Sequence, residues 1–253
     1  MNLNKDNYYS QEANEHYMSA SQYKDFCKCP ACAIAKIKGE YVQEETEALF
    51  VGKYLDAYCD GELDNFIAEH SDKIYQKNGK KYAYILKADK AISVIEDDTV
   101  LKDLLTNGER QVIMTGKIQG VDVKIMIDCL HKDKIVDGKY MRDFADVWNG
   151  VEKVPFWRNW GYDVQAALYV EIYEQNTLEK LPFELACVSK EEEPDKFWGR
   201  FTDKTLNETL EEIKANIVLF DDMKKGNAEI YGCGKCDYCK SLKKLSESDR
   251  REL

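Results

Sequence analysis

Two segments, Lys124-Ile-Met-Ile-Asp128 and Ile135-Val-Asp137-Gly-Lys139, decide how the chain is interpreted. In each of them an apolar run leads into an aspartate, which predicts two short strands that carry carboxylates. Alternate residues of a strand share one face, so Asp137 and Lys139 are expected to point the same way. If the two strands pair as a hairpin, Asp128 lies beside Asp137. Two carboxylates and an ammonium group would then meet at one point.

Such a trio has a chemical use. Hard divalent cations such as Mg²⁺ take oxygen ligands, and one or two carboxylates with waters and a substrate phosphate suffice. The cation lowers the pKa of a bound water, which Lys139 could orient. The backbone carbonyl of Gly138 is a further candidate ligand. The alternative is an ordinary surface hairpin, although a carboxylate that ends a buried strand needs a partner and a metal ion is one.

The composition limits the class of protein. The 253 residues are 44% hydrophobic and 33% charged, which is typical of a globular chain with a real core. The sequence has neither a long apolar run that could cross a membrane nor a secretory signal, so the cytoplasm is the expected location. The net charge of −11 argues mildly against nucleic acid as a ligand, because affinity for phosphate comes from Lys and Arg. A local basic groove could still bind nucleic acid on a chain with this net charge.

Helical patterns come first along the chain and strand patterns later. Ser19 with Gln22 forms a capping box that opens a helix, and helical spacing continues to about residue 107. Beyond Gly108 the pattern predicts strands over 111–116, 121–130 and 134–137, a helix over 162–175, a buried strand over 183–189 and a helix over 206–223. This order predicts an α/β domain with a central mixed sheet flanked by helices.

Several further motifs stand in a fixed order between residues 17 and 245. They are Tyr17-Met-Ser-Ala-Ser-Gln-Tyr, Leu49-Phe-Val-Gly-Lys-Tyr-Leu-Asp56, Gln111-Val-Ile-Met-Thr-Gly116, Asp128, Ile135-Val-Asp-Gly-Lys139, Trp160-Gly-Tyr-Asp-Val-Gln165 with Tyr169, and the C-terminal cysteines. The ordered set resembles the PD-(D/E)xK exonucleases of the exodeoxyribonuclease VIII type, which are common in phage and prophage recombination modules. The resemblance implies a restriction-endonuclease-like core.

The resemblance implies roles for individual residues. Asp128 and Asp137 match the metal-binding carboxylates of the family, and Lys139 matches its catalytic lysine. Gln165 and Tyr169 match the Q-x-x-x-Y helix motif that lines the DNA path, and their spacing of four puts both side chains on one helical face. Without the other motifs, a buried helix face would explain these two residues equally well.

Two positions depart from the pattern of the family. Many relatives have a metal-binding histidine where this chain has Asp56, four residues after Gly52. An aspartate also binds Mg²⁺ or Mn²⁺, so the role can survive. In Gly138-Lys139-Tyr140, a larger apolar residue and a threonine are usual on either side of the lysine. These departures bear on activity more than on fold.

The cysteines form a second candidate site. Cys233-Gly-Lys-Cys236-Asp-Tyr-Cys239 is a C-x₂-C-x₂-C run, which in a reducing compartment indicates a metal centre rather than disulfides. A fourth ligand would come from Cys27, Cys29 or Cys32. The chain resembles nucleases of the recombination-repair and CRISPR-adaptation types, which implies a [4Fe–4S] cluster with Cys29 as the fourth ligand. Zn²⁺ accepts the same four thiolates. A third interpretation is that these cysteines are free thiols that bind no metal.

The resemblance implies one PD-(D/E)xK nuclease-like domain. We expect a loose leader over 1–18, the domain over 19–245 with a helical part to about 107 and a catalytic core from about 108, and a frayed tail over 246–253. The implied activity is that of a Mg²⁺- or Mn²⁺-dependent exonuclease that degrades linear duplex DNA, 5′ to 3′, in phage-type recombination. Two-metal chemistry would use Asp56, Asp128 and Asp137.

The implied partners are duplex DNA ends, the single-strand product and a single-strand annealing protein. Processive relatives form rings, so a homo-oligomer is consistent with the resemblance. Two other functions stay open on the same fold. One is an endonuclease or an end-trimming nuclease of the CRISPR-adaptation type, which the cysteine arrangement favours. The other is a catalytically weak module that binds DNA or a protein, and Gly138, Tyr140 and the acidic net charge leave open such a chain that kept the fold but binds a partner.

Overall fold

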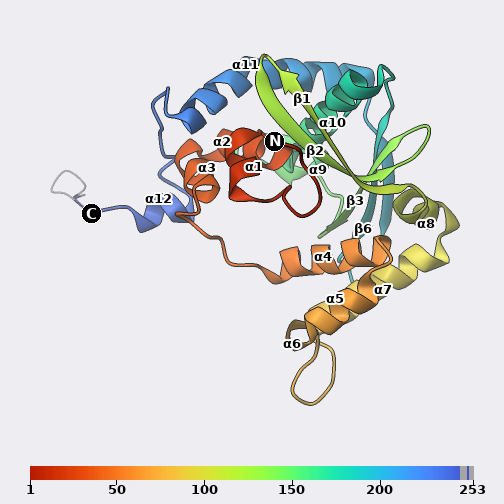
Figure 1. Ribbon diagram of the computed structural model, residues 1–253. Coiled ribbons are helices and arrows are strands. Elements are labelled where there is room, and N and C mark those ends of the chain that lie inside the picture. Colours follow the sequence, from red (N-terminus) through yellow and green to blue (C-terminus); the bar gives the residue numbers. More distant parts are fainter. Residues whose placement is uncertain (246–249, 251–253) are drawn as a thin grey trace. The chain divides into compact units, whose positions relative to one another are not determined.

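The computed structural model describes residues 1–245 and Arg250 (Figure 1). Apart from Arg250, the tail expected over 246–253 lies outside the described residues. The helices are α1 (Gln11–His16), α2 (Ala20–Lys28), α3 (Pro30–Ile37), α4 (Glu47–Cys59), α5 (Leu63–Glu69), α6 (Ser71–Ile74), α7 (Ala83–Asp97), α8 (Thr99–Thr106), α9 (Phe156–Asn159), α10 (Tyr162–Thr177), α11 (Asp203–Lys225) and α12 (Asp237–Ser241). The strands are β1 (Glu109–Ile118), β2 (Val121–Leu130), β3 (Ile135–Met141), β4 (Val147–Trp148), β5 (Lys153–Val154), β6 (Phe183–Ser189) and β7 (Lys196–Arg200).

The five-stranded sheet has the order β1-β2-β3-β6-β7. Strand β3 runs antiparallel to β2 and parallel to β6, and β7 is antiparallel to β6. The parallel pair requires a crossover, which α10 provides between β3 and β6. All residues of β6 are buried, as its apolar sequence predicts for a central strand. The predicted α/β fold with a central mixed sheet flanked by helices is confirmed.

The chain divides into two compact units. One unit combines residues 1–43, 117–123 and the part from 212 onward, and the other combines residues 44–116 and 124–211. The division expected near residue 107 therefore falls inside the second unit. The reason is that α4 and α8 pack on β3, while α7 and α8 pack on β6, so these helices share a core with the strands.

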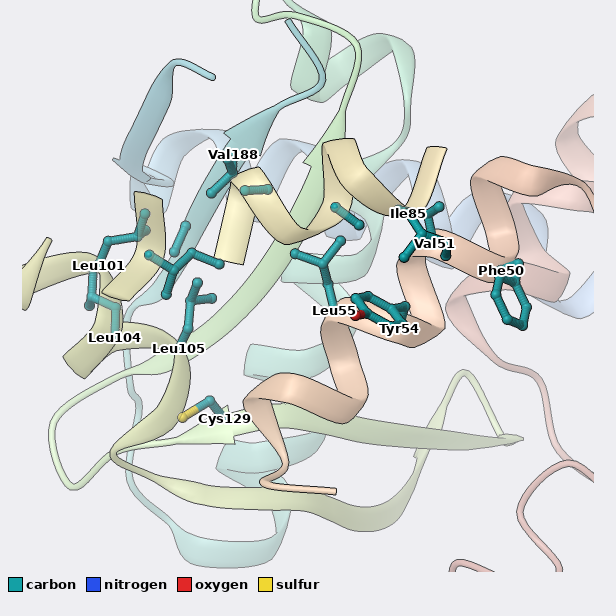
Figure 2. Packing of buried hydrophobic residues seen from close by; sticks show 14 of the residues in the cluster. Phe50, Val51, Tyr54, Leu55, Ile85, Leu101, Leu104, Leu105, Cys129 and Val188 are labelled. Carbon is teal, nitrogen blue, oxygen red and sulfur yellow. The ribbon is translucent and has the colours of Figure 1, made fainter. Parts of the chain in front are cut away.

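That shared core lies in the second unit. Its buried members come from α4, α6, α7, α8 and the strands, and Figure 2 labels Phe50, Val51, Tyr54, Leu55, Ile85, Leu101, Leu104, Leu105, Cys129 and Val188. On α7 the buried residues Ile85, Ala88 and Ile95 follow helical spacing, as expected from the sequence. Burial of this face fixes α4 over the sheet. Asp56 follows the buried Leu55 on α4, so its position depends on this packing.

The first unit begins earlier than expected. The loose leader expected over residues 1–18 is not what the structure shows, because α1 forms with Ser10 as its N-cap and Ala13 is fully buried. A helix of six residues is too short for its periodicity to be recognised in a sequence. The helix start predicted at Ser19 is confirmed, since its Oγ accepts a hydrogen bond of 3.2 Å from the backbone N–H of Gln22. The side chain of Gln22 donates to the carbonyl of Asn14 at 2.8 Å instead of completing the capping box.

Pro30 also has a simple place in this unit. It occupies the first turn of α3, where a proline needs no amide hydrogen, so the chain forms two short helices instead of one kinked helix. Cys29 lies between α2 and α3 and is buried. Within the described residues, no helix is long and apolar enough to span a lipid bilayer.

Candidate active site and cysteine cluster

Strand pairing brings the two aspartates together. Cys129 pairs with Val136 and Leu130 pairs with Ile135 between β2 and β3. One further step in the same register sets Asp128 opposite Asp137. The Asp137 side chain is 1% exposed, whereas the Asp128 side chain is 33% exposed. One carboxylate is therefore held inside the protein and the other reaches the solvent.

Lys139 lies beside both carboxylates. Its Nζ is 2.5 Å from Oδ2 of Asp137 and 4.0 Å from Oδ2 of Asp128. Asp137 and Lys139 alternate on β3, so they share the face that the sequence pattern predicts. Burial alone would lower the pKa of Lys139, but the attraction of Asp137 and Asp128 is larger and raises this pKa. Lys139 therefore stays cationic at neutral pH.

Helix α10 holds the other oxygen of Asp137. The side-chain Nε2 of Gln165 donates a hydrogen bond of 2.6 Å to Oδ1 of Asp137. Oδ2 is buried, and its contact is the ion pair with Lys139. Tyr169 follows one turn later on α10, is also buried and packs its ring against Phe183. Gln165 and Tyr169 thus face the sheet together, as their spacing predicts.

Asp56 joins the carboxylates from α4. A cavity of about 250 Å³ is lined by Asp56, Asp128, Gly138 and Lys139, among others. The Asp56 side chain reaches the solvent, but the surrounding protein limits its solvation and the negative charge of Asp137 repels it, so its pKa rises to about 6. The pKa of Asp128 is also raised, first because the surrounding protein limits its solvation and second because Asp137 repels its charge.

These oxygens fit a hard divalent cation. The raised pKa values of Asp56 and Asp128 show that negative charge gathers here and that Lys139 compensates it only in part. A cation such as Mg²⁺ or Mn²⁺ would take its place among Asp56, Asp128, Asp137 and the carbonyl of Gly138. The aspartates are not packed as tightly as the cysteines. In the described part of the chain, only the cysteine group brings three or more ligand atoms within 4.8 Å of one another.

The four predicted cysteines meet in the first unit. The Sγ atoms of Cys29, Cys233, Cys236 and Cys239 all lie within 4.8 Å of one another. Backbone amides point at them, since the N–H of Cys233 donates to Sγ of Cys29 at 3.3 Å and the N–H of Cys236 donates to Sγ of Cys233 at 3.3 Å. The backbone N–H groups of Lys235 and Cys236, which both donate to Sγ of Cys233, lower the pKa of Cys233 to about 6, which favours the thiolate that a metal needs.

The spacing of the sulfurs bears on which metal they fit. Four thiolates at about 2.3 Å from one tetrahedral Zn²⁺ ion lie about 3.8 Å apart. Cys29 and Cys239 are separated by 3.6 Å between their Sγ atoms, which is close to that value. The donor set also suits an iron–sulfur cluster, which takes four cysteine thiolates. Cys27 is exposed and stands outside the group.

Comparison with known proteins now gives the family. The model of a PDDEXK-like domain of unknown function (DUF3799) matches residues 19–242. The chain belongs to this PDDEXK-like family. A crystal structure of a protein called "putative exonuclease" from Eubacterium rectale has 38% sequence identity and a TM-score of 0.91, over 98% of this chain and 96% of that chain. No curated protein matches the chain. Both matches support a nuclease with the restriction-endonuclease-like fold.

In this PDDEXK-like domain Tyr162 lies near Lys139, a contact that the sequence pattern did not predict. The Tyr162 ring centre is 5.6 Å from Nζ of Lys139, and burial raises the pKa of Tyr162 to about 12, so the phenol stays neutral. Tyr162 is three residues before Gln165, about one helical turn away, and this spacing indicates that both side chains lie on the same face of α10.

Gly138 has a packing reason in this chain, because a Cβ there would lie 2.9 Å from Cδ2 of Leu105.

The hydrogen bond from Gln165 gives a first prediction for this PDDEXK-like domain. Gln165→Leu should lower metal-dependent DNA hydrolysis by about 10- to 100-fold, because Asp137 loses the group that orients it. The rate should be measured beside Gln175→Leu, an exposed glutamine on the same helix. If both variants keep the wild-type rate, Gln165 does not act through Asp137.

Proposed function

We propose that this chain is a Mg²⁺- or Mn²⁺-dependent exonuclease that degrades linear duplex DNA from its ends in phage-type recombination. The observation that carries the proposal is the setting of Asp137. One oxygen is held by Gln165, the other pairs with Lys139, and the neighbouring Asp56 and Asp128 open to one cavity. The family match and the similar structure support nuclease chemistry. The 5′-to-3′ direction is proposed from the resemblance to exodeoxyribonuclease VIII.

Each group has a distinct part in this proposal. Asp56, Asp128, Asp137 and the carbonyl of Gly138 would hold two cations. Bound cations neutralise charge that develops on the phosphate and lower the pKa of a bound water. Lys139 would orient the attacking water and keep positive charge beside the phosphate. Gln165 would orient Asp137, and Tyr169 would line the DNA path.

The choice between exonuclease and endonuclease depends on the shape of the substrate. Linear duplex DNA labelled at either the 5′ or the 3′ end should lose its 5′ label first, while closed circular DNA of the same sequence stays intact. Cleavage of the circle would support the endonuclease alternative. Removal of a few terminal nucleotides followed by arrest would support the end-trimming alternative, which the cysteine group favours.

The proposal includes a structural metal centre on Cys29, Cys233, Cys236 and Cys239. The resemblance to recombination-repair and CRISPR-adaptation nucleases implies a [4Fe–4S] cluster, whereas the separation of 3.6 Å between two sulfurs supports Zn²⁺. Anaerobic purification followed by iron, sulfide and zinc analysis separates the two. A single-strand annealing protein as partner and a homo-oligomer also belong to this proposal. Sedimentation of the protein alone measures the oligomer, and sedimentation with an added annealing protein measures the partner.

The raised carboxylate pKa values predict that metal binding depends on pH. Asp56 has a pKa of about 6 in the metal-free protein, and only its ionised form binds a cation. Lowering the pH from about 7 to about 5 should weaken Mn²⁺ binding by at least about tenfold, because about a tenth of Asp56 remains ionised one unit below its pKa. Titration calorimetry at the two pH values measures this difference.

The raised pKa of Asp56 also predicts how the stability of the metal-free protein changes with pH. The folded pKa of Asp56 is raised above its ordinary value, so this group favours folding when protonated and loses that contribution as the pH rises from about 4 to about 6. Added Mn²⁺ should therefore stabilise the protein more at about pH 7 than at about pH 5. Asp56→Asn should reduce the pH dependence of Mn²⁺ binding. An unchanged dependence in this variant would assign it to other groups.

A further inference from the structure

One segment of the chain carries a charge opposite to that of the whole. Residues 71–90 contain six lysines against two aspartates, a net charge of +4, in a chain whose net charge is −11. Affinity for nucleic acid depends on such local positive charge rather than on the total. The segment comprises α6, the loop that follows it and the first half of α7. It lies in the same unit as Asp56, Asp128 and Asp137.

The loop between α6 and α7 is a short hairpin. Tyr75 pairs with Lys81 in an antiparallel bridge, and the N–H of Gln76 donates to the carbonyl of Lys80 at 2.8 Å. Asn78 and Gly79 form its tip, where Gly79 has a φ of +78° that suits glycine. Figure 1 shows this loop reaching away from α5, α6 and α7. We call residues 75–81 the basic hairpin.

The lysines of this region divide into two groups. Lys73 pairs with Glu45, Lys81 with Asp89 and Lys90 with Glu193, each with 2.7 Å between nitrogen and oxygen. The first two ion pairs hold the base of the hairpin against the segment that leads into α4 and against α7. Lys77, Lys80 and Lys87 are exposed and form no ion pair with any residue that the structure describes. Their charge is therefore available to an anionic partner.

We propose that the basic hairpin and Lys87 bind the phosphate backbone of duplex DNA beside the active site. This inference rests on the proposed function and adds the surface that holds the substrate. Glu45, which anchors the hairpin through Lys73, directly precedes the N-cap Thr46 of α4. From Thr46 to Asp56 the helix rises about 15 Å, the length of roughly four base pairs. Duplex that extends from the cavity along α4 would meet these lysines.

The binding test compares two charge-matched triple variants. The variant K77A/K80A/K87A removes the proposed contacts, and K38A/K132A/K153A removes three exposed lysines elsewhere. Binding of a labelled duplex with Ca²⁺ in place of Mg²⁺ is followed by fluorescence anisotropy at several salt concentrations. Each lost phosphate contact should reduce the slope of log K against log salt by about 0.9, so the first variant should lose about two to three and the control almost nothing.

A second measurement separates the hairpin from the chemistry. A small phosphodiester cannot reach the hairpin from the active site. The rate at which K77A/K80A/K87A hydrolyses it should therefore stay within about twofold of the wild-type rate. K77E/K80E, which alters the tip alone, should also weaken duplex binding. If wild type binds the duplex and both hairpin variants keep its salt slope, the inference is overturned while the proposed function stands. If wild type binds no duplex and hydrolyses no ester, the proposed function fails first.

Discussion

Asp137→Asn should lower metal-dependent DNA hydrolysis by on the order of 10³-fold, close to the background rate. The substitution keeps the shape of the side chain but removes its charge. Asp137 is 1% exposed, one of its oxygens accepts a hydrogen bond from Gln165 and the other pairs with Lys139. The neutral amide would bind a cation much more weakly than the carboxylate does and would not compensate the charge of Lys139. Release of acid-soluble nucleotides from linear duplex measures the effect.

The matched control for this variant is Asp133→Asn. Asp133 lies four residues earlier, in the turn between β2 and β3, and its side chain is 73% exposed. It should keep the wild-type rate, since an exposed ion pair with Lys134 contributes little. A thermal melt of both variants shows whether the fold is kept. A folded Asp137→Asn variant with more than about a tenth of the wild-type rate would exclude Asp137 as a metal ligand.

Cys236→Ser should release the metal of the cysteine site and lower the melting temperature by roughly 5–10 °C. The site joins Cys29, between α2 and α3, to a C-terminal segment about two hundred residues away. A metal bound there crosslinks both ends of the first unit, so its loss removes folding free energy directly. Metal analysis and a thermal melt on the same sample measure both effects.

Cys27→Ser is the control for the cysteine site. Cys27 belongs to the same N-terminal run as Cys29, but it is exposed and outside the group of four. It should keep the metal content and melting temperature of wild type. If Cys236→Ser also keeps both values, the four sulfurs lie together without holding a structural metal.

The centre of the candidate site follows from local sequence rules. Period-two alternation places Asp137 and Lys139 on one face of β3, and the short turn before Lys134 forces β2 and β3 to pair. That pairing sets Asp128 beside them. Helical spacing puts Gln165 and Tyr169 on one face of α10. These steps need only contacts between neighbours in sequence or across one hairpin.

Other features depend on contacts between distant segments. The spacing of Cys27, Cys29 and Cys32 cannot select one of them, and burial at the junction of α2 and α3 singles out Cys29 in the fold. Tyr162 acquires its place only because α10 packs against the sheet, which brings its first residue near Lys139. The division into two units arises because residues before 44 pack with residues after 211. Edge strand β7 (Lys196–Arg200) carries charged ends and a glycine, so its pattern is too weak to predict a strand.

The central claim is that Lys139 and its carboxylates form a metal-dependent nuclease site. The most direct measurement is the release of nucleotides from linear duplex DNA with Mg²⁺ or Mn²⁺, by anaerobically purified wild type and by Lys139→Ala. We expect digestion by wild type only when metal is present, and a rate lower by on the order of 10²- to 10³-fold in the variant. Equal digestion by both proteins, or no digestion by wild type with either metal, would contradict the account.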